Sequence, residues 1–488
     1  MKIREWLGEI SYTLQQGSLD AEVSEVVYDS RKAGPGAVFI CMKGTRRDSH
    51  DFIPQVTEAG VRVTEHPVEV SSQVTVIVVG NGREALARLS AARFGNPSRQ
   101  LLMIGVTGTK GKTTTTHMIR AILLAAGKKV GMIGTTGTVI GYVVTPTLNT
   151  TPESYELHQA FAQMVEAGCE YAVMEVSSQG IKMHRTDGLY FNYAIFTNIS
   201  PDHIGPGEHA DFEEYLYYKT RLLNMCGIGL VNKDDEHAPQ IIKAANCELY
   251  TYSEESKEAD FVASDIRYVS QPDFVGTEFH ISGKYDMEVR LGIPGLFNVV
   301  NALAAVSVCS FLGLDQARIS HALENIRVNG RMEIVYTSER CTVLVDYAHN
   351  AVSMESLLST LRDYKPKRLV CVFGCGGNRS KDRRYSMGEI GGKMADLSII
   401  TADNSRYEKV EDIIADIRGS IEKTGGKFIE IPDRREAIRY SILHAQPGDM
   451  VAVIGKGHED YQEINGVRHH FLDREVIEET VKELGEKA

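Results

Sequence analysis

The chain has 488 residues, of which 43% are hydrophobic, and its formal net charge is −12 at pH 7. This length predicts about three domains with separate cores. The negative charge is spread along the sequence, whereas a nucleic-acid-binding protein concentrates positive charge on one surface. Charged residues interrupt Met1–Trp6, where a signal peptide needs an apolar segment, and the longest mostly apolar stretch, 302–314, is too short to cross a bilayer. We therefore expect a soluble cytoplasmic protein that binds neither nucleic acid nor membrane.

Residues 1–98 contain short strand-like runs at 25–28, 36–40 and 74–79. They end in Gly95-Asn96-Pro97-Ser98, a sequence typical of a domain boundary. These features predict a small N-terminal α/β domain. Asp29-Ser30-Arg31 follows the first run, and its residues alone favour a simple turn.

The stretch Gly105–Thr114 lies between an apolar strand at 101–104 and a helical pattern that runs to Gly127, a typical residue for a helix end. Glycines let backbone N–H groups approach phosphate oxygens, and a helix N-terminus adds partial positive charge. Lys112 would reach the outer phosphates of a nucleotide and Thr113 would contact magnesium. The motif is a shortened form, Gly-x-x-Gly-Lys-Thr, so an ordinary strand-to-helix turn is the alternative.

Strands and helices alternate over residues 99–330, which predicts a mainly parallel sheet whose ligands gather at the carboxyl ends of its strands. Four polar clusters occupy such ends: 149–153, which includes a Thr N-cap pattern before a helix at 155–165, and 175–178, 197–203 and 232–235. One carboxylate there is commonly a helix cap, but several are harder to explain in that way. With a triphosphate bound, Glu175 and His203 could hold magnesium. Lys219, in a helix at 212–221, is expected to face solvent.

Asn329-Gly330-Arg331 is interpreted as a second linker, before a C-terminal domain of Rossmann-like α/β type. Its strands, at 342–345, 368–373, 397–401 and 450–454, each end in polar or glycine-rich residues. Two such domains facing one another predict a cleft that closes over a substrate and excludes water. Cys371 and Cys375 are expected to be buried free thiols rather than metal ligands.

Eight motifs occur in the order found in the Mur ligases, and the resemblance covers nearly the whole chain. They are Thr107–Thr114, Asn149–Pro152, Glu175–Ser178, Thr197-Asn198 with Asp202-His203, Asn232 with Asp234-Asp235, Gly295–Asn298, Asp346–His349 and Gly455–Glu459. The resemblance implies a UDP-sugar-binding domain at 1–98, a central P-loop ATP-binding domain at 99–330 and an amino-acid-binding domain at 331–488. It also implies a monomer with small-molecule substrates.

The resemblance assigns roles to individual residues. Those implied to bind ATP are Gly108, Thr109, Lys110, Gly111, Lys112, Thr113, Thr114, Asn298, Arg331 and Asp346. Magnesium would be held by Thr113, Glu175, His203 and Lys219, the last matching a carbamylated lysine, N6-carboxylysine. Catalytic roles are implied for Lys112, Lys219 and His203. The residues implied to bind the UDP-muramoyl-dipeptide are Ser30, Asn149, Thr150, Thr151, Ser177 and Arg185. Those implied to bind the incoming amino acid are Arg379, Asp403, Asn404, Arg406, Gly455 and Glu459.

The implied reaction adds a diamino acid to UDP-N-acetylmuramoyl-L-Ala-D-Glu through an acyl phosphate, in peptidoglycan precursor synthesis. A planar guanidinium at Arg406 suits the second carboxylate of meso-2,6-diaminopimelate, and L-lysine would leave this charge unpaired. We therefore favour diaminopimelate, with L-lysine or another amine as alternatives because Ser405 replaces a common proline. A ligase like folylpolyglutamate synthase fits the N-terminal domain less well. A P-loop switch ATPase would need a repeat, coiled coil or basic tail, none of which is evident.

Overall fold

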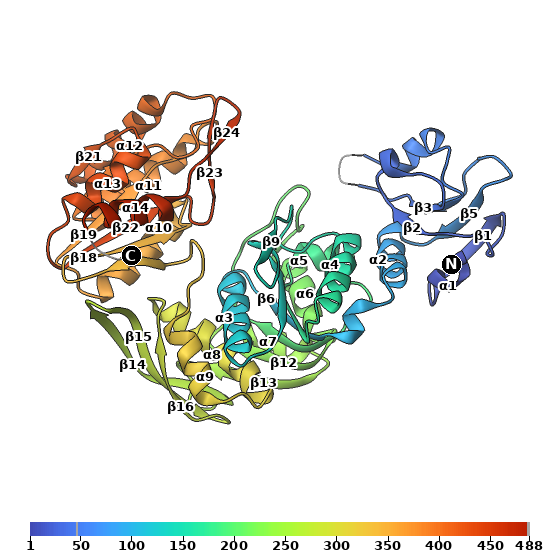
Figure 1. Ribbon diagram of the computed structural model, residues 1–488, viewed down its shortest axis with the longest axis horizontal. Helices are drawn as coiled ribbons and strands as arrows, with labels where there is room; N and C mark the ends of the chain where they lie inside the picture. The colour runs from blue at the N-terminus through green and yellow to red at the C-terminus, as the bar shows by residue number, and fades with distance from the viewer. Residues whose placement is uncertain (45–46, 486–488) are drawn as a thin grey trace. The chain divides into compact units, whose positions relative to one another are not determined.

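The computed structural model describes residues 1–44 and 47–485 (Figure 1). The chain divides into two compact units, one formed by residues 1–262 and 303–315 and the other by 263–302 and 316–488. The first unit contains an N-terminal sheet and a central sheet, and the second contains the C-terminal sheet. None of the described helices is long and apolar enough to cross a membrane.

The N-terminal sheet has the strand order β1-β5-β4-β3-β2, in which β1 is antiparallel to β5 and the other pairs are parallel. Its strands are β1 (Tyr12–Gln16), β2 (Glu25–Val27), β3 (Ala37–Ile40), β4 (Val61–Thr64) and β5 (Thr75–Val79). The sequence predicted β2, β3 and β5 but not β1 or β4. Helix α2 (Gly82–Arg93) begins at Asn81, whose side chain accepts two backbone N–H groups, and it buries Leu86 and Leu89 in the core of this sheet.

The remaining N-terminal elements are short. They are α1 (Ile3–Leu7), η1 (Ser30–Lys32), η2 (Ser49–Gln55) and η3 (Pro97–Gln100). The turn predicted at 29–31 is the 3-10 turn η1, which the Asp29 side chain caps by accepting the Arg31 N–H.

Within the first unit, the central sheet follows the order β13-β12-β11-β6-β10-β7-β8-β9, and its pairs from β13 to β7 are parallel as predicted. The parallel strands are β6 (Leu102–Thr107), β7 (Val130–Gly134), β10 (Tyr171–Glu175), β11 (Phe191–Phe196), β12 (Cys226–Asn232) and β13 (Glu248–Ser253), and β8 (Gly137–Ile140) and β9 (Val143–Thr145) are antiparallel. In the register, Val106 pairs with Glu175, and Thr107 pairs with Phe196. The carboxyl ends of these strands therefore lie at one edge of the sheet.

The central helices are α3 (Lys112–Ala125), α4 (Ser154–Glu166), α5 (Ser178–Lys182), α6 (Phe212–Thr220), η4 (Arg221–Asn224) and α7 (Ala238–Ala244). Gly127, with φ +75°, follows the α3 cap as predicted. The predicted Thr cap of α4 is wrong, because the N-cap residue is Glu153 and no side chain bonds to the helix there. The Thr151 hydroxyl instead donates to the Glu175 carbonyl and accepts the Ser177 N–H, so it is bonded to the neighbouring strand end rather than to the helix.

The expected alternation of strands and helices up to residue 330 is also wrong over residues 261–291. Three consecutive strands occupy this segment, namely β14 (Phe261–Gln271), β15 (Phe274–Gly283) and β16 (Met287–Leu291), and β15 and β16 pair antiparallel. Alternate residues of β16 are buried, the pattern of a strand with one solvated face. Two helices follow, α8 (Leu296–Phe311) and α9 (Gln316–Glu324). Ala304 and Ala305 of α8 are fully buried.

The C-terminal sheet has the order β17-β18-β22-β19-β20-β21, with β17 antiparallel and the other pairs parallel. Its strands are β17 (Glu333–Thr337), β18 (Cys341–Asp346), β19 (Arg368–Phe373), β20 (Leu397–Ile400), β21 (Phe428–Glu430) and β22 (Asp449–Ile454). The helices are α10 (Ala351–Asp363), α11 (Lys381–Met394), α12 (Val410–Thr424), α13 (Arg434–Leu443) and α14 (Asp473–Glu483). A hairpin of β23 (Tyr461–Ile464) and β24 (Val467–His470) was not predicted. Cys371 and Cys375 are buried free thiols, as expected.

A fully buried ion pair lies beneath the polar loops of this domain. The Arg434 guanidinium contacts both carboxylate oxygens of Asp473 at 2.7 Å, and neither side chain is exposed. Arg434 also donates to the carbonyls of Ala402 and Ile454, which lie just beyond β20 and at the end of β22. The pair therefore fixes two strand ends relative to each other.

We predict that Arg434→Met lowers the free energy of unfolding by about 3–5 kcal/mol, because it leaves the Asp473 charge buried without a partner. Urea denaturation measures this change. The matched control is Arg435→Met, which removes an exposed pair with Glu479 and should change stability by less than about 1 kcal/mol. Equal effects of the two substitutions would contradict the structural role of Arg434.

Candidate active site

The glycine loop between β6 and α3 has the geometry of an anion-binding site. Gly108 has φ +146° and Gly111 has φ +86°, conformations that favour glycine. A Cβ atom at Gly108 would lie 1.9 Å from the Thr197 hydroxyl oxygen, so no larger residue fits there. The first N–H groups of α3 have no acceptor within the helix and are available to phosphate oxygens. Thr114 is buried in this first turn.

Two residues at the end of β11 hold the loop in place. The Thr197 hydroxyl lies 3.1 Å from the Thr107 carbonyl and 2.6 Å from the Lys110 carbonyl. Asn198 accepts the Lys110 N–H on its side chain at 2.9 Å and the Thr109 N–H on its carbonyl at 2.8 Å. Thr197 and Asn198 belong to the polar cluster expected at 197–203, but no contact with the glycine loop was predicted for them. The adjacency of β11 and β6, which the sequence does not reveal, is what brings them to the loop.

Two lysine amines converge on one carbonyl oxygen of the loop. The Gly108 oxygen accepts from Lys112 Nζ at 2.8 Å and from Lys219 Nζ at 2.6 Å. Lys219 is only 2% exposed, so the expectation of a solvent-facing side chain is wrong. Burial and repulsion from Lys112 together hold the pKa of Lys219 well below its usual value. Lys219, which the resemblance singled out as a carbamylated lysine, therefore lies beside the glycine loop between β6 and α3.

The predicted metal residues are brought together only in part. The Thr113 hydroxyl donates to Glu175 at 3.0 Å, and the same carboxylate accepts from the backbone N–H and the hydroxyl of Thr135. Glu175 is 1% exposed. A carboxylate beside a hydroxyl fits magnesium, which takes oxygen ligands and commonly needs only one or two carboxylates besides phosphates and water.

His203 lies apart from that pair. Its side chain is 58% exposed and contacts Glu208 at 3.2 Å, and no contact joins it to Thr113 or Glu175 in residues 1–44 and 47–485. That part of the chain also contains no group of three or more His, Cys, Asp or Glu side chains placed to hold a metal. The Thr113–Glu175 pair is therefore the local donor set that suits magnesium.

Most of the residues expected to bind the dipeptide substrate lie at the same edge of the central sheet, and Ser30 lies in the N-terminal domain. Thr151 accepts the Ser177 N–H at 2.9 Å, and its carbonyl accepts from Arg185 at 3.0 Å. The Arg185 guanidinium also pairs with Glu153, which in turn contacts Arg83 of α2 at 3.3 Å. Thr150 lies 3.1 Å from the Thr135 hydroxyl, Asn149 is exposed, and Ser30 is half-buried in η1 of the N-terminal sheet.

Three residues expected to contact nucleotide lie in the second unit. Asp346, at the end of β18, accepts the backbone N–H groups of Met332 and Ala348 at 2.7 and 2.8 Å. Burial raises the pKa of this carboxyl group. The Arg331 guanidinium lies 5.0 Å from the centre of the Tyr347 ring. Asn298 is buried in the first turn of α8 and donates to the Pro294 carbonyl.

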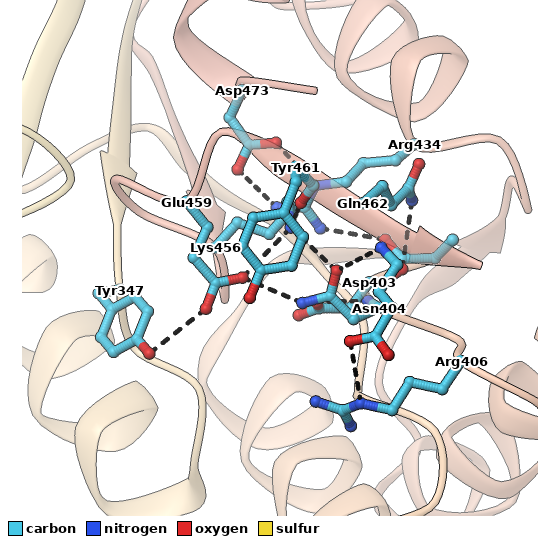
Figure 2. A network of polar contacts seen from close by, with 12 residues as sticks. Tyr347, Asp403, Asn404, Arg406, Arg434, Lys456, Glu459, Tyr461, Gln462 and Asp473 are labelled. Carbon is cyan, nitrogen blue, oxygen red and sulfur yellow. Dashed lines mark hydrogen bonds and ion pairs between the residues drawn. The ribbon is translucent and has the colours of Figure 1, made fainter. Parts of the chain in front are cut away.

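Figure 2 shows a network of polar residues at the ends of β20 and β22. The Asn404 amide donates to Glu459 at 3.0 Å, and Tyr347 donates to the other oxygen of Glu459 at 3.4 Å. Lys456 is fully buried and lies 3.3 Å from the Asn404 oxygen and 3.4 Å from Glu459. Asp403 faces Gly455, where an added Cβ would come within 2.8 Å of the carboxylate. The predicted residues Asp403, Asn404, Gly455 and Glu459 therefore form one site, whose internal cation Lys456 was not predicted.

The two predicted arginines of this site differ in their surroundings. Arg406 has φ +51° and donates to the Gly377 carbonyl at 2.7 Å, which places it against the glycine loop after β19. Arg379, at the end of that loop, is exposed, and no hydrogen bond or ion pair joins it to Arg406 or Glu459 within the described ranges. Sequence reasoning also missed Glu463, whose carboxylate lies 3.5 Å from Arg406 Nε.

Comparison with known proteins gives a family for this fold and site. The Mur ligase middle domain matches residues 106–309, the Mur ligase glutamate ligase domain matches 330–457, and the Mur ligase family catalytic domain matches 22–94. The chain is 38% identical over 476 residues to the UDP-N-acetylmuramoyl-L-alanyl-D-glutamate--2,6-diaminopimelate ligase of Caldanaerobacter subterraneus subsp. tengcongensis, with 96% of each chain covered. It is 40% identical over 468 residues to the enzyme of the same name from Geobacillus thermodenitrificans, covering 93% of this chain and 94% of that one.

A solved structure of a ligase with that name aligns over 100% of both chains with a TM-score of 0.76 and 30% identity. The chain therefore belongs to the Mur ligase family and has its three-domain α/β fold. It is an ATP-dependent ligase, and the resemblance noted in the sequence is confirmed.

Proposed function

We propose that the protein joins meso-2,6-diaminopimelate to the γ-carboxylate of D-glutamate in UDP-N-acetylmuramoyl-L-Ala-D-Glu, with ATP as the energy source, in peptidoglycan precursor synthesis. The observation that carries the proposal is the convergence of Lys112 and Lys219 on the phosphate loop, beside the Thr113–Glu175 pair. The names of the relatives, which cover nearly the full chain, support this choice of substrates.

The reaction needs ATP because a carboxylate is a poor electrophile near neutral pH. A carboxylate oxygen of the substrate attacks the γ-phosphorus, and the bond from that phosphorus to the bridging oxygen of ADP breaks, which yields an acyl phosphate. Lys112 and the N–H groups at the start of α3 offset the negative charge that develops. Magnesium, held by Thr113 and Glu175, would supply further positive charge at this position. The assignment of Thr109, Lys110, Asn298, Arg331 and Asp346 to the nucleotide, and of His203 to the metal, belongs to the same proposal.

The amine then attacks the carbonyl carbon of the acyl phosphate, and phosphate leaves from the tetrahedral intermediate. Only a neutral amine can attack, and free amines are mostly protonated near pH 7. A base must therefore take up the amine proton. In this proposal, Asn404 and Glu459, which hydrogen-bond to each other, hold the ammonium group at the far end of the diamino acid, and Arg406 pairs with its second carboxylate. Arg379, Asp403 and Gly455 complete the proposed amino-acid site.

We further propose that Lys219 carries a carbamate. The neutral amine that its lowered pKa favours can attack the carbon of carbon dioxide, and loss of the amine proton leaves a stable anion. This anion would replace repulsion from Lys112 by attraction. It would also supply the oxygen ligands that an amine lacks, which is the chemistry a second magnesium requires.

The UDP-muramoyl-dipeptide is assigned to the edge of the central sheet. Thr150, Thr151, Ser177 and Arg185 lie there, with Asn149 in the adjacent loop and Ser30 in the N-terminal domain. Glu153 pairs with both Arg185 and Arg83, so one carboxylate faces two guanidinium groups and a net positive charge remains there for an anionic substrate. We also propose that the enzyme is cytoplasmic and monomeric.

The test of the proposed function is phosphate release from ATP with each substrate omitted in turn. A ligase of this kind releases phosphate only when both the UDP-muramoyl-dipeptide and an amine are present. A panel of amines, with the tripeptide product measured, then distinguishes diaminopimelate from L-lysine and other amines. Substantial phosphate release without either substrate would favour a switch ATPase, and activity on a folate substrate would favour a folylpolyglutamate synthase.

For Lys112→Ala we expect turnover to fall on the order of a hundredfold or more, the scale for loss of a donor that stabilises developing charge. Steady-state phosphate release measures the effect. Lys128→Ala, which removes a half-buried lysine paired with Glu170 beyond the other end of α3, is the control and should retain normal turnover. Near-normal turnover of the Lys112 variant would remove the central assignment.

For Lys219→Ala we expect a loss of activity that short carboxylic acids such as acetate partly restore, because they can occupy the space of the missing carbamate. Rates are compared with and without the added acid. The Lys112→Ala protein serves as the control, since a carboxylate cannot replace its positive charge. Full activity of the Lys219 variant without added acid would exclude the carbamate.

For Arg406→Ala we expect the preference for diaminopimelate over lysine to shrink by about tenfold or more, the scale of a charged hydrogen bond. The ratio of kcat/KM values for the two amines is the measurement. Arg418→Ala, which removes an arginine exposed on α12, should leave this ratio unchanged. A wild-type enzyme that prefers lysine would show that the argument from the Arg406 charge is wrong.

A further inference from the structure

The Arg406 guanidinium, which is proposed to bind the second carboxylate of the amine substrate, already has the Glu463 carboxylate beside it. Arg406 Nε lies 3.5 Å from the Glu463 carboxylate, and the two side chains are 23% and 22% exposed. Both groups are thus partly shielded from water. A charge pair in such surroundings interacts more strongly than one on an open surface. Glu463 belongs to β23 and was given no role by the sequence.

Backbone contacts hold Glu463 in this position. Arg406 donates its N–H to the Glu463 carbonyl at 2.9 Å, and the Glu463 N–H donates to the Asn404 side chain at 2.9 Å. On the preceding residue of the strand, the Gln462 side chain donates to the Asp403 carbonyl at 3.2 Å. Strand β23 is therefore fastened to the loop that carries the proposed amine-binding residues, and the carboxylate stays near Arg406.

A second cation close to Glu463 is otherwise engaged. Arg468 stands opposite Glu463 in the β23–β24 register, but its guanidinium lies over the Tyr461 ring, 4.2 Å from the ring centre. Across the described ranges, Arg406 is the one cation within ion-pair distance of the Glu463 carboxylate. The charge of Glu463 therefore acts mainly on Arg406.

The Arg406 guanidinium still has N–H groups to offer a ligand. A guanidinium carries five N–H donors. One of those on Nη1 is used by the Gly377 carbonyl, and Nε faces Glu463, which leaves the Nη2 side for an incoming carboxylate. A second carboxylate bound there would share Arg406 with Glu463 and experience its repulsion.

We propose that Glu463 is a specificity-determining residue that weakens selection for amines carrying a second carboxylate. With an amine such as lysine in the site, no second carboxylate reaches Arg406. Glu463 then balances the charge of Arg406, so binding of lysine loses little free energy. With a dicarboxylic amine in the site, two anions compete for one guanidinium. This inference rests on the proposed function, because it concerns the amine substrate of the same reaction.

The test is the ratio of kcat/KM for diaminopimelate to that for lysine, in the wild type and in Glu463→Gln, which keeps the size of the side chain and the strand contacts. The ratio should rise by about threefold to fivefold in the variant, the scale of a partly exposed ion pair. The change should come from KM for the amine and not from kcat, because Glu463 lies beside the far end of the substrate. If Glu463→Gln cannot be obtained folded, Glu463→Asp, with a carboxylate of shorter reach, should shift the ratio in the same direction.

Two further variants separate charge from loop placement. Gln462→Ala removes a neighbouring strand-to-loop hydrogen bond while keeping both charges, and it should leave the ratio unchanged. In an Arg406→Ala background, Glu463→Gln should have no further effect on the ratio, because the two residues act through one interaction. An unchanged ratio in Glu463→Gln, or an equal shift in Gln462→Ala, would overturn the inference while product formation still upheld the proposed function. Absence of product with every amine would overturn both.

Discussion

The contact on which the rest of the catalytic arrangement depends is the meeting of two lysine amines at the Gly108 carbonyl oxygen. Two ammonium groups on one acceptor repel each other, and the burial of Lys219 makes its charged form still less favourable. The loop can place its carbonyl there only because Gly108 adopts a backbone conformation that excludes a side chain, packed against Thr197. The glycine loop thus serves both phosphate binding and the chemical state of a lysine more than a hundred residues further along the chain.

The amino-acid site is built on buried charge in a comparable way. Lys456 is fully enclosed, and its amine contacts Asn404, Glu459 and the Tyr461 carbonyl, so loss of the Glu459 carboxylate would leave a buried ammonium without its counter-charge. Beneath it, Arg434 and Asp473 fix the strand ends from which these residues emerge. The polar residues that would meet the substrate are therefore held by other polar residues rather than by apolar packing alone.

The sequence predicted the strand ends well, because parallel strands buried on both faces are continuous apolar runs followed by polar residues. It did not predict which strands are neighbours, and so it missed Thr197 and Asn198 as supports of the glycine loop. The burial of Lys219 had a signal, since Tyr215 lies one helical turn earlier on the same buried face of α6. Strand β16 also showed alternation of apolar and charged residues that favours a solvated sheet face. Glu463 had no such signal, because only the folded hairpin brings it to Arg406.

The ion pairs of Glu153 join two parts of the first unit that differ in sequence position and in proposed ligand. This carboxylate contacts Arg83, at the start of α2 in the N-terminal domain, and Arg185, beside the Thr151–Ser177 contact of the central sheet. Tyr28 and Tyr155 add hydrogen bonds to Glu156 and Glu25 across the same boundary. Recombination that exchanged the N-terminal domain for that of a relative would have to carry a matching cation at position 83, or the Glu153 carboxylate that supports Arg185 would lose one of its two partners. The residues on the two sides of this boundary are consequently expected to change together, so the first domain is not an interchangeable module.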